Sequence, residues 1–266
     1  MFTKFPRRSL LVALASLTIA GVATTASATH SWGGYHWART ANPFTIKLGN
    51  NMSSGAWISA LNTASSDWSA SDVLNTTVVA GLANPRNCKA TAGRVEVCNS
   101  TYGNNGWLGL ATISITGGTH ITRGSVKLND TYFNTAQYNT SAWKALVTCQ
   151  EIGHTFGLDH QDENFNNGNL GTCMDYTNNP GTNQHPNAHD YDELDIIYAH
   201  LDTTTTIGQG AGKSLAPDLD HNDARNWGQL VKQSHGGRTA IYELDTGGGS
   251  KTVTFVIWAL EGGGNR

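Results

Sequence analysis

A glutamine, a glutamate and two histidines lie within residues 150–160, and their types and spacing suit metal-dependent hydrolysis. On a helix, positions 150 and 154 lie about 6 Å apart along the axis and about 40° apart around it, so both side chains can reach one ion. Glu151 is well placed to accept a proton from water on that ion without binding the ion itself. His160 would lie about 15 Å from position 150 on a continuous helix, whereas a zinc–ligand bond is about 2 Å, so the chain must turn back.

Gly157 is suited to that turn, because glycine adopts left-handed backbone conformations without a Cβ penalty and often ends helices. The run Gln150-Glu151-Ile152-Gly153-His154-Thr155-Phe156-Gly157-Leu158-Asp159-His160 resembles the zinc-binding signature of the metzincin metallopeptidases. The one departure from the signature is glutamine in the place of the first histidine.

A second segment extends this resemblance. Cys173-Met174-Asp175-Tyr176 is similar to the Met-turn beneath the metzincin zinc site, with Met174 as its methionine. Residues 106–111 and 124–129 are similar to the strands that precede the active-site helix in matrixin-like secreted proteases. The resemblance spans about residues 35–200, and the helix and the Met-turn are its specific parts.

The resemblance implies a secreted zinc endopeptidase. Glu151 would be the general base toward a water on Zn²⁺, and His154 and His160 would hold the metal with Gln150 as a provisional third ligand. Tyr176 would be a supplementary ligand or would stabilise the transition-state oxyanion. A peptide or protein substrate would bind in an extended form along an edge strand of the sheet.

Gln150 leaves alternatives open, because an amide oxygen is a weaker zinc ligand than an imidazole nitrogen. A residue distant in sequence could supply the missing ligand, and the histidines available for this are His120, His185 and His189. The alternative function, from another class, is a non-catalytic secreted peptide- or protein-binding pseudoprotease with a weakened metal site.

Hydrophobic periodicity predicts strands and helices in the order of an α+β fold. The metzincin resemblance implies that the strands form a mixed twisted sheet and that one helix is the active-site helix. Helices are expected near residues 54–69, over 141–156 with Ser141 as a possible N-cap, and near 191–201. Strands are expected at residues 44–48, 76–79, 93–97, 108–115 and 125–128.

The domain organisation follows from composition. We expect a signal peptide at residues 1–28, a metzincin-like domain at 29–202, a Thr- and Gly-rich linker at 203–217 and a β-rich appendage at 218–266. Two β-like runs in the appendage, 239–244 and 252–259, predict a small hairpin. A lone hairpin is marginally stable in water, so it should pack on the preceding domain.

Four cysteines in an exported chain predict two disulfides. We expect Cys88 to pair with Cys98 across a short hairpin-like loop. The metzincin resemblance places the active-site helix near the Met-turn, which implies a Cys149–Cys173 bond. Cys149 lies on the same helical face as Leu146, so it should point to the core and is not expected to bind zinc.

The first 28 residues predict secretion: basic residues precede an apolar run from Leu10 to Ala20 and a cleavage site at Ala26-Ser27-Ala28. Arg7-Arg8 leaves Tat export as an alternative to Sec export. No stretch of the mature chain approaches the roughly 18 apolar residues of a membrane span. The lack of a dense basic cluster among 17 basic and 20 acidic residues argues against nucleic-acid binding, and nothing indicates an oligomeric state.

Overall fold

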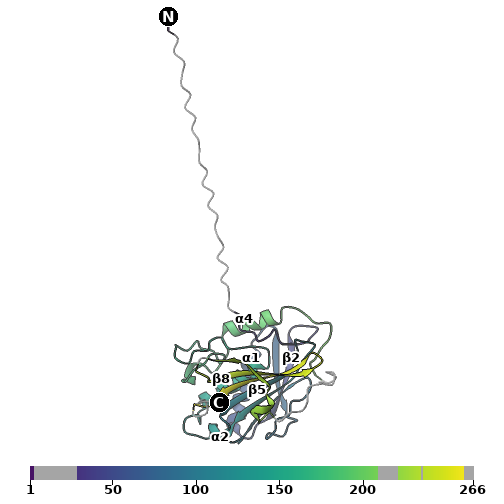
Figure 1. Cartoon of the computed structure of the whole chain (residues 1–266), viewed down its shortest axis with the longest axis vertical. Helices are drawn as coiled ribbons and strands as arrows, with labels where there is room; N and C mark the ends of the chain where they lie inside the picture. The colour runs from purple at the N-terminus through teal and green to yellow at the C-terminus, as the bar shows by residue number, and fades with distance from the viewer. Residues whose placement is uncertain (3–28, 209–220, 235, 261–266) are drawn as a thin grey trace.

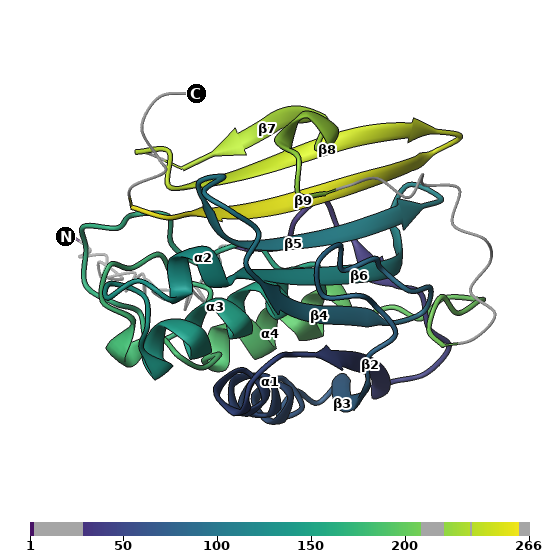
Figure 2. The ribbon, with the colours of Figure 1, turned by 90° about the horizontal axis from the view of Figure 1, so that it is seen from below.

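The protein is a mixed α+β structure built around one twisted sheet, seen in a computed structural model that describes residues 1–2, 29–208, 221–234 and 236–260 (Figures 1 and 2). Its strands are β1 (His36–Trp37), β2 (Phe44–Asn51), β3 (Leu74–Ala80), β4 (Val95–Ser100), β5 (Trp107–Thr116), β6 (His120–Asn129), β7 (Gln229–Gln233), β8 (Thr239–Gly247) and β9 (Ser250–Trp258). Its helices are α1 (Gly55–Trp68), α2 (Asp130–Phe133), α3 (Ser141–His154) and α4 (Ala188–Ile197), with 3₁₀ turns η1 (Pro180–Thr182) and η2 (Ala224–Asn226).

The sheet has the order β3-β2-β4-β6-β5-β9-β8-β7, and β1 also pairs with β6. Strands β1, β2, β3, β4 and β6 are mutually parallel where they pair, whereas β5, β7, β8 and β9 pair only in antiparallel fashion. The predicted α+β class with a mixed sheet is therefore confirmed. The five strands predicted in the first 130 residues are all present, each with somewhat different bounds.

Helices α1 and α3 lie side by side against the sheet, and their buried faces meet in the main apolar core. Trp68 of α1 donates its indole N–H to the carbonyl of Cys149 at 3.1 Å, which fixes the two helices together. The predicted helix positions are confirmed within a few residues, but two boundaries were wrong. Thr140, not Ser141, is the N-cap of α3, because its side chain accepts the Trp143 amide at 3.1 Å.

The second boundary is the start of α4, which begins at Ala188 rather than near Tyr191. Asn187 and Asp190 form a reciprocal capping box that satisfies the first free amides of the helix. The sequence analysis missed β1, α2 and β7, elements of two to five residues that are too short to show a hydrophobic period.

The C-terminal strands continue the sheet past β5 (Figure 2). Strand β9 pairs antiparallel with β5 from Trp107↔Trp258 to Ile115↔Lys251, and β8 and β7 follow. One face of β9 packs in the main core, and the other joins a second apolar cluster around Trp227. The predicted hairpin is therefore present and packs on the preceding residues. Its domain boundary stays a prediction, and residues 209–217 of the predicted linker lie outside the described residues.

Both predicted disulfides are present, Cys88–Cys98 and Cys149–Cys173. The predicted signal segment, apart from residues 1–2, lies outside the described residues. In the part of the chain that the structure describes, every helix is too short or too polar to cross a membrane.

Candidate metal centre

The predicted Met-turn, residues 173–176, packs against α3. Met174 is fully buried, and its Sδ would be 2.7 Å from a Cβ at position 153, so Gly153 provides the space for this contact. The Cys149–Cys173 disulfide and a 3.0 Å hydrogen bond from Gln150 Nε2 to the Cys173 carbonyl link the same two segments. The predicted proximity of helix and Met-turn is thus observed.

The chain turns back after α3 at Gly157, which has a φ of 97°. A Cβ at this position would be 2.0 Å from the backbone oxygen of Tyr35, a contact that no flexible side chain can relieve. This turn carries residue 160 back toward the helix, so that His160 and His154 meet.

We expect Gly157→Ala to lower the free energy of unfolding by at least about 2 kcal/mol, because the variant combines backbone strain with the clash on Tyr35. Urea denaturation checks this. Gly168→Ala is the matched control, since a Cβ at Gly168 meets nothing within 4 Å and should leave stability almost unchanged. A Gly157→Ala chain as stable as the control would contradict the assigned role of the turn.

The two histidine side chains meet through their Nε2 atoms, 3.1 Å apart. His154 Nδ1 donates to the Leu158 carbonyl at 2.9 Å, which leaves the lone pair on its Nε2. Burial, together with the neighbouring His160, lowers the pKa of His154 to about 3, so its imidazole is neutral. Burial also lowers the pKa of His160, despite the opposing effect of Asp159. Two neutral imidazoles at this separation need a proton or a cation between them.

A hydrogen-bonded chain leads to His160 from the C-terminal strands. The Thr239 hydroxyl donates to Tyr176, whose hydroxyl lies 2.8 Å from His160 Nδ1. Burial raises the pKa of Tyr176 well above its ordinary value, so the phenol keeps its proton. If Tyr176 donates to His160 Nδ1, the His160 proton lies on Nε2 and points to His154. A metal ion between the two Nε2 atoms would replace that proton. The remaining proton of His160 would then lie on Nδ1, 3.3 Å from Asp159 Oδ1, which can accept it in a hydrogen bond.

The side-chain amide of Gln150 is buried, and only its nitrogen has a hydrogen-bond partner. Its Nε2 donates to the Cys173 carbonyl, which can only accept, so the orientation of the amide is fixed. Its Oε1 is buried without a hydrogen-bond partner. A buried carbonyl oxygen without a donor is costly, and a bound cation would satisfy it. Gln150 also lies four residues before His154 on α3, on the same helical face, so the residues present fit a zinc ion.

Glu151 is the second buried acceptor on α3. It is 1% exposed, its Oε2 has no hydrogen-bond partner, and burial raises its pKa well above the ordinary value. A Cβ on Gly109 of β5 would lie 2.7 Å from Glu151 Oε1, so the missing side chain at Gly109 leaves room for the carboxyl. A carboxyl group held in this way is typical of a general acid or base at a reacting centre.

Lys232 of β7 is a site residue that the sequence analysis missed. Its ammonium forms ion pairs with Asp159, at 2.5 Å, and with Glu163. Burial opposes the ionisation of Asp159, but its hydrogen bonds with His160 and Lys232 hold its pKa below the ordinary value. A lone lysine 72 positions beyond His160 in the chain gives no sequence signal; only the pairing of β7 with β8 brings it here.

The C-terminal strands cover the site with three side chains, here called the cover residues: Lys232, Thr239 and Phe255. The Phe255 ring of β9 stacks on His154, with centroids 4.4 Å apart and planes 6° apart. His154 and His160 are 1% and 8% exposed as a result, so the described conformation is closed to a large substrate. The sequence showed β-like runs here but not that one of them lies over the histidines.

The three histidines considered as substitute ligands are engaged elsewhere. His120 contacts Asp202 at 3.2 Å, His185 contacts Asp67 at 2.7 Å, and the ring of His189 stacks on His30 at 4.9 Å.

No family model matches the sequence, and no curated protein matches it. Among solved structures, high choriolytic enzyme 1, a hatching enzyme zinc-protease from Oryzias latipes (Medaka fish), is 12% identical with a TM-score of 0.35, covering 65% of this chain and 99% of that one. Two structures of myroilysin are also 12% identical, with TM-scores of 0.35 and 0.33. Each covers 61% of this chain, with 96% and 86% of their own chains matched. Similarities this distant do not support a functional argument, which rests on the contacts described above.

Proposed function

We propose that this protein is a secreted zinc-dependent endopeptidase with His154, His160 and Gln150 as metal ligands. The observation that carries the proposal is the meeting of the Nε2 atoms of His154 and His160 at 3.1 Å. Gln150 Oε1 and Glu151 Oε2, both on α3, support it because they are buried without hydrogen-bond partners. Ligand atoms about 2.0–2.2 Å from a tetrahedral zinc lie about 3.3–3.6 Å from each other, close to the separation of the two Nε2 atoms.

The chain's own residues divide the work of peptide hydrolysis. Bound zinc would polarise the scissile carbonyl and make water more acidic. Glu151 takes the proton from the attacking water and passes it to the leaving amine, a task for which a raised pKa is suited. Tyr176 keeps its phenolic proton and so has a donor to offer to a developing oxyanion, once the cover residues move.

Substrate entry requires the C-terminal strands to move. The main chain of β5 passes Glu151 at Gly109, and both of its sides are already paired, with β6 and β9. An extended peptide can add to β5 only if β9 gives up that place. Peptide binding along the edge of β5 therefore requires an open conformation, in which Phe255 no longer stacks on His154.

We expect Phe255→Ala to raise kcat/KM for a peptide substrate at least about tenfold. The substitution removes contacts that stabilise the closed conformation, and each 1.4 kcal/mol lost from it raises the ratio of open to closed molecules about tenfold. The initial rates of a fluorogenic peptide check this. Phe133→Ala is the control. Phe133 is as buried as Phe255, but it packs on Trp57 and is not one of the cover residues. An unchanged rate, or an equal rise in both variants, would contradict the role of the cover.

Secretion is supported by the two disulfides, which persist in oxidising compartments, and by the signal-like N-terminal residues. The enzymatic proposal is tested by digesting an unfolded protein with the purified mature chain, with added zinc and with a zinc chelator. Zinc-dependent fragments are expected in mass spectra. A chain that binds zinc and the unfolded protein but produces no fragments would instead be the non-catalytic binding protein.

A further inference from the structure

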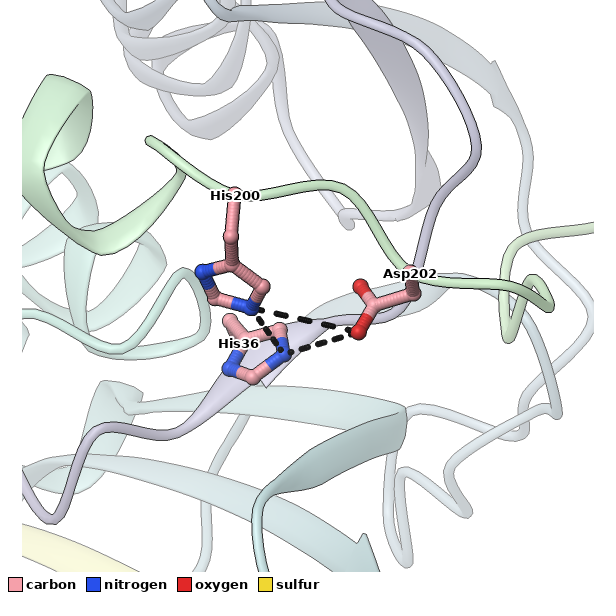
Figure 3. A group of neighbouring side chains, drawn as sticks. All are labelled: His36, His200 and Asp202. Atoms are coloured by element: carbon pink, nitrogen blue, oxygen red, sulfur yellow. Dashed lines mark hydrogen bonds and ion pairs between the residues drawn. The ribbon is translucent and has the colours of Figure 1, made fainter.

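Two segments far apart in the chain bring the imidazoles of His36 and His200 to the carboxylate of Asp202 (Figure 3). His36 lies in β1 and His120 begins β6, and the two are direct partners in the β1–β6 register. His200 and Asp202 follow α4. The Nε2 atoms of His120, His36 and His200 lie 3.2, 3.5 and 3.9 Å from Asp202 Oδ1.

The separations within this group fit a tetrahedral metal site. His36 Nε2 and His200 Nε2 lie 3.2 Å apart, and Figure 3 shows both, with Asp202 Oδ1, at the corners of one small triangle. Ligand atoms about 2.0–2.2 Å from a tetrahedral zinc lie about 3.3–3.6 Å from each other. His120 Nε2 contacts the same carboxylate oxygen at 3.2 Å, but it lies outside the group whose ligand atoms are all within 4.8 Å of one another, so it is a neighbour of the site and not its fourth corner.

The surroundings orient these groups as they do in metal sites. His36 Nδ1 donates to the Gly34 carbonyl at 2.9 Å, so its Nε2 presents a lone pair. Asp202 Oδ2 accepts from the backbone amide and from the guanidinium of Arg39, both at 3.1 Å, which leaves Oδ1 facing the imidazoles. Arg39 is 1% exposed and also donates to the carbonyls of Tyr198 and His200, so the segment after α4 is held in place.

Access and chemistry point to one class of ligand. The side chains of His36 and Asp202 are 6% and 11% exposed, whereas those of His120 and His200 are 31% and 54% exposed, so an ion can enter from solvent. Imidazole nitrogen with one carboxylate oxygen suits zinc and related divalent transition metals.

We propose that His36, His200 and Asp202 form a second divalent-metal site, separate from the centre at His154 and His160. It is a structural site: it ties β1 to the segment that ends the predicted metzincin-like domain at residue 202. A metal bound there stabilises the folded chain by mass action, because the unfolded chain does not hold these segments together.

Zinc stoichiometry of matched histidine variants tests the proposal. The mature chain, His200→Ala and His185→Ala are each dialysed against the same free zinc concentration, and the bound metal is measured. Both variants remove an exposed imidazole beside a carboxylate, since His185 is 59% exposed and pairs with Asp67. Zinc at His154 and His160 contributes equally to all three chains, so the difference reports only the second site.

We expect the His200→Ala chain to bind zinc at the second site at least about tenfold more weakly and to lose close to one equivalent, while His185→Ala matches the unchanged chain. The rise in melting temperature with zinc should shrink in the same variant. A second variant, His36→Ala, removes the other imidazole of the site and should also weaken binding, which guards against an effect peculiar to position 200. Equal stoichiometry and equal zinc stabilisation in all the chains would overturn the proposal.

Discussion

Replacing Glu151 with glutamine should lower kcat for peptide hydrolysis by about 10²–10⁴-fold, because the proton acceptor is lost while the shape of the side chain is kept. Glu151 is fully enclosed between α3 and Gly109 of β5, and glutamine fills the same space without removing a proposed ligand. Steady-state hydrolysis of a fluorogenic peptide measures the effect.

The control for Glu151→Gln is zinc content, which should equal that of the unchanged chain, because Gln150, His154 and His160 are still present. Loss of both zinc and activity would show a structural effect of the substitution. Full activity with zinc retained would remove Glu151 from the mechanism and leave the reaction without its proposed base.

Replacing Gln150 with histidine is the second change with a large expected effect. Imidazole nitrogen is a better zinc donor than an amide oxygen, so the zinc affinity should rise at least about tenfold. Position 150 is 1% exposed beside the Met-turn, and histidine is close to glutamine in size. Competition with a chromogenic zinc chelator measures the change.

Gln150→Met is the matched control for this substitution. It keeps the length and the burial of the side chain but removes the Oε1 that has no other partner, so zinc affinity should fall. Equal affinities in the glutamine, histidine and methionine chains would show that position 150 does not contact the metal. The metal centre would then have two protein ligands from this segment rather than three.

The contacts over the site give the C-terminal strands a role in the proposed mechanism, which is to close the site. Lys232 forms ion pairs with Asp159 and Glu163, Thr239 contacts Tyr176, and Phe255 stacks on His154, so each of the three C-terminal strands contacts the site. Burial of Phe255 against β5 and α3 stabilises this closed state. In the proposed mechanism, substrate access therefore requires β9 to separate from β5.

The parts of the site that sequence could predict are those set by local spacing. The i, i+4 relation of Gln150 and His154 and the glycine at 157 determine a helix followed by a turn, and the structure contains both. The positions of Cys149 and Cys173 became informative only with the Met-turn resemblance, and their bond is present. These features can be predicted from the sequence because each depends on only a few residues.

The parts that sequence could not predict depend on long-range pairing. Val253, Phe255 and Ile257 lie on one face of a strand that is buried on both sides, but nothing in the sequence of β9 says which strand it joins. Its pairing with β5 places Phe255 on His154. Likewise, His36 and His200 lie 164 positions apart, and only the folded chain brings them together.

The most direct test of the central claim is anomalous diffraction at the zinc absorption edge from crystals of the mature chain grown with zinc. The account predicts an anomalous peak bonded to His154 Nε2, His160 Nε2 and Gln150 Oε1. A zinc-saturated crystal with no peak between these three atoms would contradict it, whether or not metal is found beside His36 and Asp202.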